Sequence, residues 1–130
     1  MKKLIVILIV FALLAGAMTA EIVFVDKYYS SLQAELEVIS DEIELNEEHI
    51  ATPELIDLCE KATAKWEKRK KLLLMLQNHN TVRGMDDKLI SLTAVVKSDN
   101  YNDAVIFVNS AINYVDDILL DSIPYLSNLL

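Results

Sequence analysis

Residues 25–43 read VDKYYSSLQAELEVISDEI, and apolar side chains recur in this stretch at alternating steps of four and three. On a helix, this heptad-like spacing places the apolar side chains in one stripe that faces a single partner. Acidic residues occupy the other faces. The stretch therefore predicts a long amphipathic helix, which we place from about Ile22 to Ile50. Its stripe consists of Val25, Tyr29, Leu32, Leu36, Ile39 and Ile43.

A second helix is predicted from Pro53 to about Asn78. Thr52-Pro53 is a strong helix-start signal, because the threonine oxygen can accept a hydrogen bond from the first turn and proline suits the first helical position. Arg69 takes one position of the stripe, where its stem can pack while its head reaches water. The other stripe residues are Leu55, Cys59, Ala62, Trp66, Leu73 and Leu76.

Two more helices follow in the sequence. After a turn at residues 78–81, capped by Asn80 or Thr81, a third helix is predicted from Val82 to about Lys97. A fourth is predicted from near Asn102, with a kink or stop near Ser122, because a proline at residue 124 disfavours a helical residue before it. The stripe of the third helix is Val82, Met85, Leu89, Leu92 and Val96, and that of the fourth is Ala104, Val108, Ala111, Val115 and Ile118.

Composition favours the same architecture. The chain has 130 residues, which is enough for one domain, and only two glycines and two prolines. All-β folds need many turn residues, so this scarcity favours long helices with few connections. We therefore predict an all-α fold: an N-terminal membrane or signal helix followed by an antiparallel bundle of about four helices. The net charge of -8 argues against nucleic-acid binding, which normally needs surplus basic residues.

The N-terminus has the pattern of an export segment. Lys2 and Lys3 precede an uninterrupted apolar run from Leu4 to Ala20. As an anchor, this run would span roughly 25 Å, which is short but tolerable. As a cleaved signal, it offers the small residues 15–17 (AGA) to a signal peptidase. We favour the anchor, which divides the chain into a signal-anchor or transmembrane helix at 1–20 and an extracytoplasmic helical domain at 21–130.

Charge around the run predicts the topology. The lysines before the run and Glu21 and Asp26 after it place the N-terminus inside the cell and the domain outside, in a single-pass arrangement. Tyr28 and Tyr29 are candidates for an aromatic belt at the membrane surface. Cleavage of the leader would instead give a secreted protein.

No residue pattern indicates catalysis. His49 and His79 lack metal-ligand spacing, and interaction with a helix C-terminus is the simpler role for both. Cys59 is favoured as a buried small hydrophobe, although pairing between two chains stays open. The acid pairs 86–87 and 116–117 point about 100° apart on a helix and are interpreted as solvated faces. We expect no catalytic residue, no cofactor-binding residue, no metal site and no cofactor.

The basic run Lys68, Arg69, Lys70 and Lys71 is the candidate interaction surface. If the first two amphipathic helices form a hairpin, the chain returns towards the membrane near His79. The run would then lie on the order of 10 to 20 Å from the membrane surface, where it can meet anionic lipid head groups or acidic wall polymers. A simpler interpretation is a solvated helix end whose charge the acidic first helix balances.

The pattern from Trp66 onward carries a family resemblance. The run WEKRKK at 66–71 leads through an apolar stretch to Asn78-His79, an acidic break follows at Asp99, and the chain ends with NLL at 128–130. With the short Met-Lys-Lys apolar start, the chain resembles domain-of-unknown-function family 4363, short proteins of Gram-positive bacteria. The resemblance spans nearly the whole chain and implies a location and a fold class but no catalytic residues. One departure is Gly84-Met85, in place of an acidic, strongly helical start.

These observations favour a membrane-tethered module with no enzymatic activity. Its predicted partners are the membrane, through the N-terminal helix, and either a protein or an anionic surface at an exposed helix face; the oligomeric state is left open. The alternative is a secreted helical module that holds a small apolar or anionic ligand between its helices.

Overall fold

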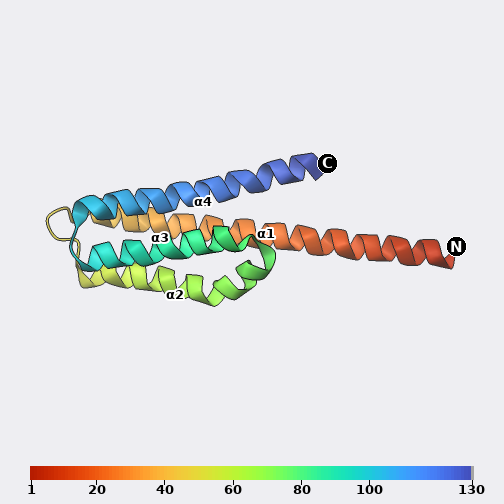
Figure 1. The fold of residues 1–130 in the computed structure, drawn as a ribbon, viewed down its shortest axis with the longest axis horizontal. Coiled ribbons are helices and arrows are strands. Elements are labelled where there is room, and N and C mark those ends of the chain that lie inside the picture. Colours follow the sequence, from red (N-terminus) through yellow and green to blue (C-terminus); the bar gives the residue numbers. More distant parts are fainter. Residues whose placement is uncertain (130) are drawn as a thin grey trace.

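The computed structural model describes the backbone of residues 1–129 and the side chains of residues 1–120. Its helices are α1 (Lys2–Leu45), α2 (Pro53–Leu76), α3 (His79–Lys97) and α4 (Tyr101–Leu129). Successive helices run antiparallel, and α1 and α3 each pack against α2 and α4 (Figure 1). No strand occurs within residues 1–129, so the predicted all-α bundle is confirmed.

Helix α1 is longer than any element that the sequence pattern predicts. It runs for 44 residues without a break, and its N-terminal part projects beyond the ends of the other helices at one end of the bundle (Figure 1). The proposed boundary at residues 20 and 21 therefore falls inside a helix. A stretch near its N-terminus is long and apolar enough to cross a membrane, and a signal sequence passes the same test. We call the end of the bundle from which α1 projects the tether end, and the opposite end the distal end.

The predicted stripes form the core. Their apolar side chains are buried, with three exceptions that are only partly buried: Val25, Leu76 and Ile118. Arg69, which takes one position of the second stripe, is exposed. Ile50 joins the core from the loop after α1. Among residues 1–120, no polar or charged residue is buried as a whole, so burial of apolar surface is the main stabilising term.

The helix ends confirm some predictions and correct others. Thr52 caps α2 as predicted, since its Oγ1 accepts a hydrogen bond from the Leu55 amide at 3.2 Å. The predicted turn at 78–81 is wrong: the Asn78 side chain accepts from the Asn80 amide at 2.8 Å, and α3 already begins at the next residue after Asn78. Helix α1 ends at Leu45, five residues before the predicted end.

Helix α4 does not stop at Ser122. It begins at Tyr101, where the Asn100 Oδ1 accepts a hydrogen bond from the Asp103 amide at 3.1 Å, and it continues through Pro124 to Leu129. A proline removes one amide donor and disfavours helix before it. The backbone is nevertheless helical on both sides of residue 124, so the local preference of proline does not end α4.

Asp99 joins the two distal loops. It has a positive φ of 58°, a conformation that aspartate and asparagine tolerate better than most residues. Its carboxylate accepts hydrogen bonds from the amides of Ile50 at 2.7 Å and Ala51 at 3.1 Å. The Nδ1 of His49 lies 2.9 Å from the other carboxylate oxygen. The α3–α4 turn thereby caps the loop that connects α1 to α2.

An aromatic cluster lies near the tether end. Trp66 is fully buried, and the rings of Tyr28 and Tyr29 lie 6.2 Å and 6.3 Å from it between centroids. Tyr29 is also fully buried and donates a hydrogen bond to Gln77 Oε1 at 2.7 Å. The predicted aromatic belt is therefore wrong for Tyr29, because its ring completes the core. Burial raises the pKa of Tyr28 and of Tyr29 above the ordinary value for tyrosine, so both stay neutral.

Asp86 supplies the polar partner of this cluster. It was expected on a solvated face, but its side chain is only 17% exposed. Its Oδ1 accepts a hydrogen bond from Trp66 Nε1 at 2.9 Å, and its Oδ2 accepts one from Lys70 at 3.1 Å. A tryptophan N–H that is buried needs such an acceptor. Asp86 therefore links α3 to two side chains of α2.

Gly84 allows α3 and α4 to approach each other. A Cβ atom at residue 84 would lie 2.8 Å from Cζ of Tyr114, and the Tyr114 hydroxyl is held by a 2.8 Å hydrogen bond to the Thr81 carbonyl oxygen. The departure at Gly84-Met85 is thus a packing requirement. It does not shift the register, because Met85 is fully buried as its stripe predicts.

Replacing Asp86 tests the acceptor role. Asp86→Ala leaves the buried Trp66 N–H without its partner and should lower the free energy of unfolding by about 1 to 3 kcal/mol. Asp86→Asn keeps an oxygen acceptor and should cost less. Trp66 is the only tryptophan, so its fluorescence during urea unfolding measures both variants. Equal midpoints for Asp86→Ala and the wild type would rule out this role.

Replacing Gly84 tests the helix contact. An exposed Gly→Ala change inside a helix normally stabilises by about 1 kcal/mol. At residue 84, displacement of Tyr114 costs about 1 to 3 kcal/mol, so Gly84→Ala should give a net loss of about 1 kcal/mol. The control is the same Gly84→Ala change in a Tyr114→Ala background, where it should stabilise, because the nearest atoms that the added Cβ would meet all belong to Tyr114. Thermal unfolding by circular dichroism separates the two, and a more stable Gly84→Ala variant would contradict this account.

Acid titration tests the Asp99 contacts. The hydrogen bonds from His49 and from the amides of Ala51 and Ile50 lower the pKa of Asp99. Its contribution to stability is therefore present above its unfolded pKa of about 3.9 and is lost as the pH falls through the lower, folded value. Near neutral pH, Asp99→Asn should have a lower free energy of unfolding than the wild type. The difference in free energy between the two proteins should narrow below about pH 4. A difference that stays constant with pH would contradict the assignment.

Candidate interaction surface

The structure divides the predicted basic run into residues with different roles. All four lie in the second half of α2, near the tether end. Lys70 is structural: it bonds Asp86 and lies 3.7 Å from a Glu67 carboxylate oxygen, and the hydrogen bond to Asp86 raises the pKa of Lys70. Arg69 places its guanidinium carbon 5.8 Å from the ring centre of Phe24 on α1, a cation–π contact. Lys68 and Lys71 are exposed.

The predicted balance by the acidic first helix holds for a different lysine. Lys65 pairs with Glu35 of α1 at 2.6 Å, one turn before the basic run. Lys61 and Lys97 pair with Asp57 and Glu60, both at 2.8 Å. Within residues 1–120, neither Lys68 nor Lys71 has an ion pair. These two lysines are therefore solvated, as the simpler interpretation predicts, but they make no direct ion pair with α1.

Two exposed apolar side chains adjoin these lysines. Met75 is 82% exposed and Leu72 is 40% exposed. Residues 68, 71, 72 and 75 are three or four apart, so they share one face of α2. We call Lys68, Lys71, Leu72 and Met75 the tip surface. Sequence reasoning missed its apolar half, because the pattern does not show that this face has no neighbouring helix.

The distal end has the opposite character. Acidic side chains gather at the end of α1, in the α1–α2 loop, in the α3–α4 turn and in the first turns of α2 and α4, whereas the tip surface is basic and apolar. The molecule is therefore polarised along its long axis. The acidic residues are Glu42, Glu44, Glu47, Glu48, Glu54, Asp57, Asp99 and Asp103.

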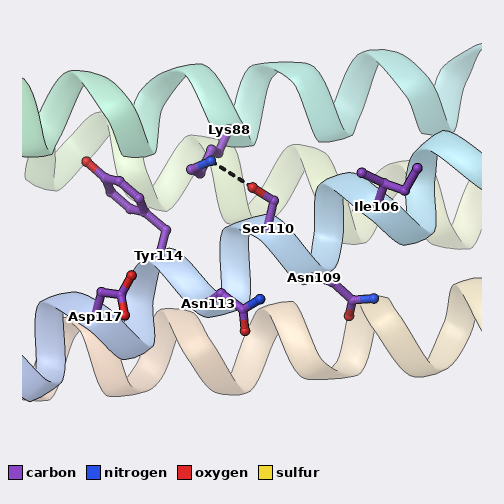
Figure 2. Close-up of a pocket in the computed structure, with 7 residues that line it drawn as sticks. All are labelled: Lys88, Ile106, Asn109, Ser110, Asn113, Tyr114 and Asp117. Carbon is purple, nitrogen blue, oxygen red and sulfur yellow. Dashed lines mark hydrogen bonds between the residues drawn. The ribbon is translucent and has the colours of Figure 1, made fainter.

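A polar groove of about 550 Å³ runs between α3 and α4. Figure 2 shows Lys88 reaching from α3 to Ser110 of α4, with a hydrogen bond of 2.7 Å. The same ammonium lies 5.3 Å from the ring centre of Tyr114. The cation and the phenol are thus engaged within the protein, which leaves mainly the α4 amides for a ligand. The groove is also lined by Ile106, Asn109, Asn113 and Asp117.

The histidines and the cysteine do not converge. His49 contacts Asp99 in the distal loops, whereas His79 is the first residue of α3 at the tether end. Neither lies at a helix C-terminus, so the predicted dipole role is wrong for both. Cys59 is 2% exposed, and burial raises its pKa to about 11, so the predicted buried hydrophobe is confirmed and its thiol stays protonated. The described part of the chain contains no group of three His, Cys, Asp or Glu side chains that could hold a metal.

In both predicted acid pairs one carboxylate makes contacts and the other is exposed: Asp86 bonds Trp66 and Lys70, whereas Asp87 is exposed. Asp116 accepts a hydrogen bond from the Gln33 side chain of α1, whereas Asp117 is exposed. This contact links α1 to α4, a role that sequence spacing cannot show.

Comparison with known proteins gives no relative: no family model, no curated protein and no solved structure matches this chain. The resemblance to domain-of-unknown-function family 4363 stays a prediction.

Proposed function

We propose that this protein is a membrane-tethered extracytoplasmic helical module that acts through its surfaces and carries out no catalysis. One observation carries the proposal: α1 continues from the bundle into a segment whose residues, up to Glu21, are all exposed. The apolar side chains from Leu4 to Ala20 have no protein cover. Each Leu, Ile, Val or Phe near the centre of a span favours insertion by about 0.3 to 0.6 kcal/mol.

Hydrogen bonding within this segment supports a membrane environment. The Thr19 hydroxyl donates to the Ala15 carbonyl oxygen at 2.8 Å, so its polar group is paired inside the helix. A helix also pairs its own backbone groups, which a lipid environment requires. Lys2 and Lys3 at one end, with Glu21 and Asp26 at the other, favour an N-terminus inside the cell and the bundle outside.

A non-catalytic role is supported by where reactive groups lie. The protonated thiol of Cys59 is buried in the core, and the two histidines lie at opposite ends of the bundle. The carboxylates with the most specific contacts, Asp86 and Asp99, are engaged in holding helices and loops together. A scaffolding or interaction role requires only a rigid bundle and an exposed surface.

The second candidate is a secreted module, because the residues at 15–17 are small and exposed, as a signal peptidase requires. Cleavage after Ala17 would leave the bundle with only a short N-terminal extension.

Membrane extraction tests the tether. The full chain, expressed in a Gram-positive host, should stay in the membrane fraction after alkaline carbonate washing. Leu13→Arg places a charge near the centre of the span and should weaken insertion by about 2.5 to 3.5 kcal/mol, which moves protein to the soluble fraction. Leu45→Arg is the control, since Leu45 is 78% exposed at the distal end.

The mature N-terminus, measured by mass spectrometry, distinguishes the two candidates. An intact residue 1–17 segment supports the tether, whereas a chain that begins after Ala17 identifies the secreted form. Release of the uncleaved wild-type chain by carbonate would contradict the tether.

A further inference from the structure

The position of the tip surface relative to the span carries an inference that rests on the proposed function. Because α1 is one unbroken helix, no flexible linker separates the span from the bundle. Arg69 lies against Phe24, four residues or about 6 Å of helical rise beyond Ala20. The head-group region of a bilayer is about 5 to 7 Å thick on each side. The turn of α2 that holds Arg69 therefore lies at the level of the head groups, and the α2–α3 turn lies at the same end of the bundle (Figure 1).

We propose that the tip surface of Lys68, Lys71, Leu72 and Met75 docks on the same bilayer that α1 crosses and prefers anionic lipids there. In Figure 1 the α2–α3 turn lies at the end of the bundle from which α1 projects towards its N-terminus. The exposed faces of α2 on that end point to no other helix. The bilayer is the occupant because the tether holds it next to this surface at all times.

The chemistry of the tip surface fits a lipid interface. Lysine ammonium groups pair with anionic head groups, while exposed Leu and Met side chains can enter the boundary with the acyl chains. Long lysine side chains reach the charged layer while their stems remain in apolar surroundings. Lys68 and Lys71 have no ion pair among residues 1–120, so docking does not require an existing contact to break.

Charge at the tether end orients the bundle. An anionic surface attracts the tip surface at short range, whereas the carboxylates around Glu47 and Glu54 lie roughly 30 Å farther away along the helices, beyond the screening length of about 8 Å. Glu21 and Asp26 on α1 lie close to the membrane, and the two lysines offset their repulsion. The bundle is thus held upright, with the polar groove of α3 and α4 facing sideways and the acidic end farthest from lipid.

Labelled full-length chain in lipid nanodiscs tests the docking. In a Cys59→Ala background, a polarity-sensitive fluorophore is attached at Met75→Cys, and at Ile106→Cys as the control, since Ile106 is 62% exposed on α4. The discs contain phosphatidylcholine alone or with one quarter phosphatidylglycerol. With phosphatidylglycerol, the label at residue 75 should show blue-shifted emission and quenching by a spin-labelled lipid. The label at residue 106 should be quenched by a water-soluble nickel chelate.

Charge is tested by Lys68→Gln with Lys71→Gln. Each lysine near an anionic surface contributes roughly fivefold to the docking equilibrium, so the pair should reduce docking by an order of magnitude or more. Lys61→Gln with Lys97→Gln removes the same charge farther from the tether end and should leave the label at residue 75 unchanged.

The outcomes separate this inference from the proposed function. A chain that fails to incorporate into discs contradicts the tether itself. An incorporated chain whose label at residue 75 is as open to the nickel chelate as the label at residue 106 overturns the docking alone. If the lipid contact of the label at residue 75 changes neither with phosphatidylglycerol nor with the lysine substitutions, the preference for anionic lipid is overturned.

Discussion

The continuity of α1 is the constraint on which the rest of the structure depends. One helix is apolar on every side in its first half and apolar along one stripe in its second half, with no break between the two. A helix transmits position and direction along its length at 1.5 Å per residue. Whatever holds the first half therefore also sets the height and orientation of the bundle. A flexible linker at residues 20–25 would remove that coupling.

The specific polar contacts of the bundle lie at its two ends, where they hold the helices rigidly in relation to α1. Near the tether end, the N–H of Trp66 and the hydroxyl of Tyr29 each reach an acceptor on or beside a different helix. At the distal end, Asp99 holds the loop between α1 and α2. Between these ends the contacts are mainly apolar, which gives stability but little directional preference. The hydrogen bonds at the ends favour one relative placement of the helices.

The fold was predictable from the sequence because helical period is a local signal. The stripe Leu32–Leu36–Ile39–Ile43 and the stripe Leu89–Leu92–Val96 are buried as predicted, since each follows from spacing alone. The contacts that sequence reasoning missed join distant residues: Asp99 to Ile50, Asp86 to Trp66, and Gly84 to Tyr114. Their partners lie 20 to 49 positions apart in hydrogen-bonded pairs, and no local pattern marks them.

The candidate surface was predictable only in part, for the same reason. A run of four basic residues correctly identifies the part of α2 that carries the surface. A helix, however, distributes four consecutive side chains around its whole circumference. Lys70 therefore faces Asp86 on α3 and Arg69 contacts Phe24 on α1, whereas Lys68 and Lys71 are exposed and have no ion pair among residues 1–120. Which face stays open depends on where the neighbouring helices lie. The surface is thus a property of the assembled bundle, and the exposed Leu72 and Met75 belong to it because no helix covers that face at the end next to the tether.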